Sequence, residues 1–152
     1  MKGNDVWKIK QTSDKGWGIF AESQIPQFTM VFKSLSLSHG TVRSSHSVQL
    51  DWETHVKMDL PARFINHSCD ANVGIVANAE GAFDFWALRD MEVGQELTWD
   101  YGGAEFHSIS IDQCLCGSPL CRAENIGFEK SHRSIRAQYG TYYAKYLHSW
   151  QP

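Results

Sequence analysis

Residues 63–72 have the sequence RFINHSCDAN, which combines polar hydrogen-bonding groups with apolar ones around one cysteine, Cys69. Two other short segments have a similar mixture. Residues 16–20 (GWGIF) place two glycines around an aromatic side chain, which permits unusual backbone angles and the close approach of a ligand. Residues 96–102 (ELTWDYG) predict a strand with a tyrosine hydroxyl at its end. Each segment taken alone has a simpler interpretation: a turn, a core Asn-His pair or a packed surface tyrosine.

Three of the four cysteines lie close together, because Cys114, Cys116 and Cys121 form the pattern C-x-C-x4-C. Three such thiolates can share one metal ion, but a closed tetrahedral zinc site needs a fourth ligand. Cys69 is the one cysteine that remains to complete it. A site closed by four cysteines leaves no position for water, so its zinc would be structural. Two disulfides, or unlinked buried thiols, are the alternatives.

The chain has 152 residues, of which 42% are hydrophobic and 20% charged, and this composition excludes disorder, collagen and coiled coil. One globular domain is expected at this length. No apolar run approaches the ~20 residues of a membrane helix, and residues 1–10 contain no apolar block typical of a secretory signal. We therefore expect an intracellular, reducing compartment without membrane contact, where clustered cysteines favour metal over disulfides.

The formal net charge of −3 is distributed unevenly, since residues 34–113 contain four Lys/Arg against twelve Asp/Glu. Direct nucleic-acid binding, which needs clustered basic side chains, is therefore not expected. An acidic surface suits a Lys/Arg-rich peptide. Ordinary solvated loops and strand edges explain the same excess equally well.

The pattern of short apolar segments separated by turn residues predicts a mostly β domain with one C-terminal helix. One helical turn is expected at residues 61–65, and the helix at residues 132–148, where apolar side chains have helical spacing although Gly140 weakens the middle. The expected strands are residues 5–11, 18–21, 28–32, 47–50, 73–76, 83–88 and 96–99.

Together, the order and spacing of these motifs resemble the SET-domain family of protein-lysine methyltransferases. Gly16-Trp17-Gly18 is similar to the family's first motif, residues 66–69 (NHSC) to its Asn-His-Ser-Cys motif, and residues 96–101 to its Glu-Leu-Thr-x-Asp-Tyr motif. The clustered cysteines resemble a post-SET segment, and in that segment the cysteine of Asn-His-Ser-Cys is the fourth zinc ligand. The cysteine-rich pre-SET region of larger histone enzymes is missing, so a minimal stand-alone type is expected. Ala71 stands where the family often has proline.

The resemblance implies the SET fold, in which short-stranded β-sheets surround a knot-like core, an exception to the rule that chains do not thread loops. It also implies a division of the chain into a SET domain at 1–113, a post-SET zinc segment at 114–130 and a C-terminal helix at 131–152.

The same resemblance implies the site residues. Tyr101 is the expected catalytic residue, and the other four tyrosines all lie in residues 139–146. S-adenosylmethionine is expected to bind to Lys15, Gly16, Trp17, Arg63, Phe64, Asn66, His67, Tyr101 and Phe128. The substrate channel is expected to contain Trp99, Tyr101 and Phe128. The expected structural zinc ligands are Cys69, Cys114, Cys116 and Cys121.

Methyl transfer requires a neutral lysine amine, and a narrow apolar channel disfavours the ammonium form. Trp99 stands two residues before Tyr101, where family members often have phenylalanine or tyrosine. If its ring points toward the channel, the lack of a hydroxyl favours di- or trimethylation, which is the outcome we expect; if its bulk intrudes, monomethylation would dominate instead. The expected partner is a basic protein or peptide such as a histone tail, which would make the protein nuclear in a eukaryote and cytoplasmic otherwise. A catalytically silent SET module that binds a basic peptide, or an unrelated zinc-stapled β domain, are the alternatives.

Overall fold

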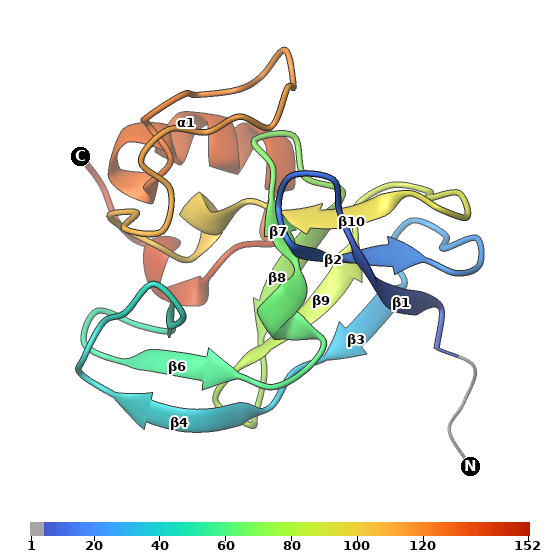
Figure 1. The fold of residues 1–152 in the computed structure, drawn as a ribbon. Coiled ribbons are helices and arrows are strands. Elements are labelled where there is room, and N and C mark those ends of the chain that lie inside the picture. The colour runs from blue at the N-terminus through green and yellow to red at the C-terminus, as the bar shows by residue number, and fades with distance from the viewer. Residues whose placement is uncertain (1–4) are drawn as a thin grey trace.

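The computed structural model describes residues 5–152, so residues 1–4 of the expected SET domain lie outside the described part. A seven-stranded sheet has the order β1-β2-β10-β8-β9-β3, with β7 also paired to β10, and a small sheet has the order β4-β6-β5 (Figure 1). The strands are β1 (Trp7–Gln11), β2 (Trp17–Ala21), β3 (Met30–Lys33), β4 (Ser36–Gly40), β5 (Val48–Gln49), β6 (His55–Met58), β7 (Asn66–His67), β8 (Val73–Ala77), β9 (Phe83–Ala87) and β10 (Glu96–Trp99). The helices are η1 (Ala62–Phe64), η2 (Tyr101–Gly103), α1 (Phe128–Tyr139) and η3 (Lys145–Leu147).

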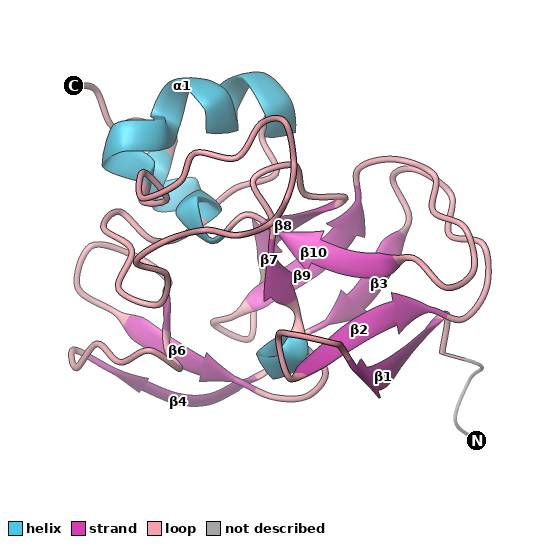
Figure 2. Ribbon diagram, turned by 45° about the horizontal axis from the view of Figure 1, so that its top comes forward, coloured by secondary structure: helices cyan, strands magenta, loops and turns pink. Residues whose placement is uncertain are grey.

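Strand β10 brings together the three motifs found in the sequence. It pairs antiparallel with β2 through Leu97↔Ile19 on one side, and in parallel with β7 through Trp99↔His67 on the other. It also pairs in parallel with β8 through Trp99↔Val73. In both ribbon views α1 and the small sheet lie at opposite ends, with β7 and β10 between them (Figures 1 and 2).

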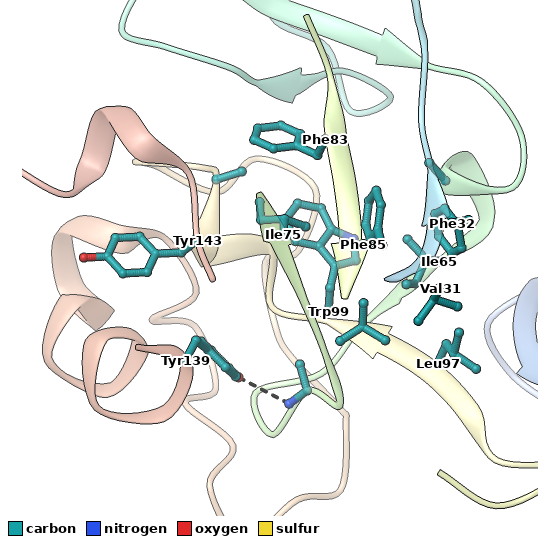
Figure 3. Packing of buried hydrophobic residues seen from close by; sticks show 14 of the residues in the cluster. Val31, Phe32, Ile65, Ile75, Phe83, Phe85, Leu97, Trp99, Tyr139 and Tyr143 are labelled. Atoms are coloured by element: carbon teal, nitrogen blue, oxygen red, sulfur yellow. Dashed lines mark hydrogen bonds between the residues drawn. The ribbon is translucent and has the colours of Figure 1, made fainter. Parts of the chain in front are cut away.

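The main core lies against β3, β8, β9 and β10, whose inward side chains are apolar. Figure 3 shows Phe85 between Phe32 and Trp99, with ring centroids 4.6 Å and 6.1 Å away. Burial of each such side chain contributes roughly 1.5–3 kcal/mol. The Tyr139 hydroxyl accepts a hydrogen bond from the Ala71 backbone N–H at 3.2 Å, so α1 is fastened to the sheet at the end of the NHSC motif.

The C-terminal helix is shorter than the sequence predicted and begins earlier. Helix α1 ends at Tyr139 because Gly140 has φ of 60°, a conformation that favours glycine and terminates helices. The chain then turns, and only the short 3-10 helix η3 follows, so the prediction of a helix to residue 148 or 152 is wrong. The apolar spacing beyond Gly140 belongs instead to a segment that packs Tyr143, Ala144 and Leu147 into the core.

Most expected strands are confirmed within one or two residues at each end, as is the helical turn at η1. Strands β4, β6 and β7 were not predicted. All but the first residue of β4 are exposed, and its SLSHG sequence has no apolar alternation, so pairing with β6 rather than local propensity defines it. Strand β7 has two residues and exists through its register with β10.

We expect Gly102→Ala to destabilise the fold by about 2 kcal/mol or more, because overpacking a full site forces the backbone to move. A Cβ atom at Gly102 would lie 2.1 Å from the Ile126 carbonyl oxygen and 2.8 Å from Ile135 Cδ1. Guanidinium denaturation with zinc present measures the change. Gly40→Ala is the matched control, since the nearest atom to a Cβ there is 3.9 Å away. Equal midpoints for the two variants would contradict the packing argument.

Candidate active site and metal centre

The four cysteines converge on one point. Their sulfur atoms all lie within 4.8 Å of one another, and Cys69 Sγ is 3.8 Å from Cys114 Sγ. This separation is far longer than a disulfide bond, and none of the four cysteines is disulfide-bonded. Four zinc–sulfur bonds of about 2.3 Å in a tetrahedron would separate the sulfurs by roughly 3.8 Å. The donor set therefore fits a structural zinc ion.

A bound metal would change the protonation of Cys69. Burial raises the pKa of the Cys69 thiol to about 11, so the protein alone would keep it protonated at neutral pH. A bound cation reverses this preference, because a metal-coordinated thiol loses its proton. The loop that carries the other three ligands is held by backbone hydrogen bonds from Cys114 to Ala123 and from Cys121 to Ser118, both 3.0 Å long.

A cavity of about 870 Å³ lies between the cysteine cluster, η1, and the ends of β7 and β10, and this is a usual size for a ligand site. Eight of the predicted cofactor and channel residues line it, namely Lys15, Trp17, Arg63, Phe64, Asn66, His67, Trp99 and Tyr101, as do the predicted zinc ligands Cys114 and Cys116. Among the lining residues that the sequence did not single out are Ser47, Val48, Met58, Glu105 and Leu115.

One part of the cavity is polar and is organised by Asn66. The Asn66 amide nitrogen donates to the Trp17 carbonyl at 3.0 Å and to Glu96 Oε1 at 2.9 Å, and Glu96 also pairs with Lys15. Both amide hydrogens of Asn66 are therefore used within the protein. The Trp17 and Phe64 rings lie 6.3 Å apart and form an aromatic corner of the cavity.

A second group of lining residues is apolar and adjoins the Tyr101 hydroxyl through Ile65; we call these residues the apolar part of the cavity. Side chains of Val48, Met58 and Ile65 line it, and the Tyr101 ring centroid is 5.0 Å from that of Trp99. The Tyr101 hydroxyl donates to the Ile65 carbonyl at 2.9 Å. Burial raises the pKa of Tyr101 well above its usual value, so the hydroxyl stays protonated at neutral pH. A neutral hydroxyl is thus fixed in an apolar wall.

His67 connects this tyrosine to the cysteine cluster. Its Nδ1 accepts the Tyr101 backbone N–H at 3.0 Å, and its Nε2 lies 3.3 Å from Cys69 Sγ. Burial lowers the pKa of His67 to about 4, so the ring is neutral. Since Nδ1 is an acceptor, the ring hydrogen is assigned to Nε2, which points it toward the sulfur.

Two of the predicted cofactor and channel residues do not line the cavity. Gly16, with φ of 74°, forms the turn between Lys15 and Trp17. Phe128 is fully buried at the start of α1, where its ring stacks on Tyr143 with centroids 5.6 Å apart. The prediction that Phe128 lines the cofactor pocket and channel is therefore wrong, because α1 turns this residue into the core. The zinc segment instead presents Leu115 to the cavity, with 87% of the residue exposed.

Glu105 is a buried carboxylate on the cavity wall that the sequence did not indicate. It pairs with Arg43 at 3.1 Å and accepts the Gln49 N–H at 3.0 Å. Burial raises the pKa of this carboxyl despite both partners. The contacts fasten β5 and the loop before it to the segment after Tyr101. Its partners are more than 50 residues away, so no local sequence signal could have found them.

The SET domain family profile matches residues 16–102, more than half of the chain. The chain belongs to the SET-domain family. Among its relatives, the histone-lysine N-methyltransferase ash1 of Drosophila melanogaster is 28% identical over 73% of this chain and 6% of that protein. SUVR4 of Arabidopsis thaliana, also a histone-lysine N-methyltransferase, is 31% identical over 74% of this chain and 30% of that protein. The chain therefore spans less than a third of the length of either.

A solved structure from work on the product specificity of histone lysine methyltransferases shares the fold, with a TM-score of 0.57 and 26% identity. The match covers 77% of this chain and 55% of that one. The mostly β SET fold expected from the motifs is thus confirmed, and S-adenosylmethionine is the methyl donor of this family. None of the helices within residues 5–152 has the length and apolar character needed to cross a bilayer. The boundaries at residues 113 and 130 stay predictions.

We expect the protein to bind one zinc ion per chain, as measured by elemental analysis. Cys121→Ser should lower the zinc content and disorder the segment after residue 113, because loss of one of four ligands weakens the metal site that draws Cys69 and this loop together. Leu120→Ala, an exposed change in the same loop, should retain the metal. A fully active preparation without zinc would refute this assignment.

Proposed function

We propose that the protein is an S-adenosylmethionine-dependent protein-lysine N-methyltransferase that acts on a basic protein such as a histone tail. The observation that carries the proposal is the Tyr101 hydroxyl, which lies in the apolar part of a cavity whose polar part is built from the other two family motifs. Relatives named as histone-lysine N-methyltransferases support the substrate class. The proposed place of action is inside the cell, and in the nucleus if the substrate is a histone.

In this proposal the polar part of the cavity holds the cofactor. The Lys15 and Arg63 cations suit the carboxylate of the methionine moiety, and the aromatic corner of Trp17 and Phe64 suits the adenine ring. The Asn66 amide is already engaged by Trp17 and Glu96, so it serves mainly to hold the turn at Gly16 against β7. His67 likewise has a structural role in the pocket, because its Nδ1 accepts the backbone N–H of Tyr101. When bound, S-adenosylmethionine supplies an electrophilic methyl group on a sulfonium.

The apolar part of the cavity would then receive the lysine side chain. A lysine amine must lose its proton before it can attack, and the walls of Val48, Met58 and Ile65 disfavour the charged form. The Tyr101 proton is directed to the Ile65 carbonyl, which leaves the lone pairs of the hydroxyl oxygen to accept an N–H of the amine. Tyr101 therefore orients the nucleophile, and because it stays protonated it does not act as a base.

We expect Tyr101→Phe to reduce methyl transfer by about 100-fold or more, the range typical of losing one preorganised hydrogen-bonding group in an active site. Cofactor affinity, measured by calorimetry, should be retained because the hydroxyl lies in the apolar part of the cavity. The assay is radiolabelled methyl transfer to core histones and to a cell lysate, with mass spectrometry of the products. Tyr142→Phe is the control, since Tyr142 packs on Phe28 outside the cavity. Turnover near wild type in the Tyr101 variant would sink the proposal.

The Trp99 side chain leads to a second prediction, which concerns the number of methyl groups added to the lysine. Its ring is 4% exposed, lines the cavity and lies beside Tyr101, and it offers no hydroxyl that could hold a water next to the amine. We expect the wild type to form di- or trimethyl-lysine, and Trp99→Tyr to shift the products toward monomethyl-lysine. Mass spectrometry of the products over time tests this. A wild type that stops at monomethyl-lysine under excess enzyme and cofactor would contradict it.

A further inference from the structure

We propose that Arg122 is a positioning residue for Tyr101 and links the zinc segment to the catalytic turn; the inference rests on the proposed function. Its guanidinium forms two parallel bonds to the Asp100 carboxylate, from Nη1 to Oδ2 at 2.7 Å and from Nη2 to Oδ1 at 2.8 Å. The side chains are 10% and 2% exposed, so this bidentate ion pair is buried.

On one side of the pair, Asp100 sets the backbone that follows Tyr101. Its Oδ1 accepts the Gly102 N–H at 3.1 Å and so caps η2, which begins at Tyr101. The Asp100 carbonyl accepts the Gly103 N–H at 2.8 Å. The orientation of this carboxylate therefore determines the first turn after the strand, and with it the position of the tyrosine.

On the other side, Arg122 is built into the metal centre. It directly follows Cys121, and its backbone N–H points to Cys69 Sγ at 3.5 Å. Its Nε donates to Ser131 Oγ of α1 at 2.9 Å and to the Asn125 carbonyl. One residue thus touches a metal ligand, the C-terminal helix and the Asp-Tyr motif. Arg122 does not line the cavity, so it acts through Asp100.

Breaking the pair from one side is costly because it leaves a buried carboxylate without a countercharge. Asp100 would then move toward water or another donor, and the η2 cap would move with it. The exposed pair of Arg89 with Asp70 provides a contrast, since its side chains are 52% and 40% exposed and water can replace either partner. Asp70 directly follows Cys69, so both pairs adjoin the metal site.

The test compares zinc-loaded Arg122→Ala, Arg122→Lys and the control Arg89→Ala. We expect Arg122→Ala to keep one zinc per chain and a peptide KM within about threefold of wild type, while kcat falls at least about tenfold, as for a misplaced catalytic group. Arg122→Lys, which cannot form both bonds, should be intermediate, and Arg89→Ala should match wild type. Unchanged kcat in zinc-loaded Arg122→Ala would overturn the inference. So would a decrease in kcat that is found only in preparations that have lost zinc.

Hydrogen exchange gives a readout that does not depend on activity. The N–H groups of residues 102–105 should exchange at least about tenfold faster in Arg122→Ala, with those of β8 and β9 unchanged; a purely local effect confined to residues 114–125 would refute the link. A wild type that transfers no methyl group would refute the proposed function. Hydrogen exchange would then still show whether Arg122 holds the turn after Tyr101. If Arg122→Ala does not fold, the double variant Arg122→Ala with Asp100→Asn removes the uncompensated charge. A wild-type kcat in this double variant would also overturn the positioning role of Arg122.

Discussion

The hydrogen bond from the Tyr101 backbone N–H to His67 Nδ1 is the interaction on which the rest of the site depends. It joins the end of β10 to a strand of only two residues, and it requires a neutral imidazole with its hydrogen on Nε2. Burial provides that state by lowering the pKa of His67 to about 4. Successive strand residues point to opposite faces, so Asn66 turns to the Trp17 carbonyl while His67 turns to Tyr101 and Cys69. One dipeptide thereby serves the polar part of the cavity, the tyrosine and the metal centre.

Two buried carboxylates then fix the segment after β10 at its two ends. Asp100 is held by Arg122 of the zinc segment, and Glu105 by Arg43 of the loop before the small sheet. The tyrosine lies between these anchors, above a core in which Trp99 packs edge-on against Phe85 (Figure 3). Parts of the chain that are remote in sequence therefore meet around one cavity, and ion pairs hold the segment that carries Tyr101 at both ends. Removing one partner of such a buried pair leaves an uncompensated charge, so both pairs resist rearrangement of this segment.

The sequence was informative where the chemistry of a site restricts the residue type. It was uninformative where contacts with residues distant in the sequence determine the local structure. Four cysteines in a dense pattern predicted one converging cluster, and the structure contains it. The cavity unites most of the predicted site residues because glycine turns, Asn-His and Asp-Tyr all occur at strand ends. Phe128 could not be placed in advance, since the direction in which α1 leaves the zinc segment depends on Arg122 and Ser131. Nor could β4 be found, because all but its first residue are exposed and its strand pairing comes from β6, which follows later in the chain.

The acidic excess of residues 34–113 has an explanation inside the molecule. Asp59 caps the Leu35 N–H, Glu80 pairs with Lys33, and Asp100 and Glu105 hold buried arginines. The three ion-paired carboxylates are offset by a neighbouring cation and present little net charge to a substrate, whereas Asp59 keeps its charge. Overall charge therefore carries little of the argument for a basic partner, which rests on the apolar part of the cavity and its tyrosine. Two loops meet beside that part, since the Ser110 hydroxyl donates to the Ser45 carbonyl at 3.2 Å and joins the loop before β5 to the segment after Tyr101.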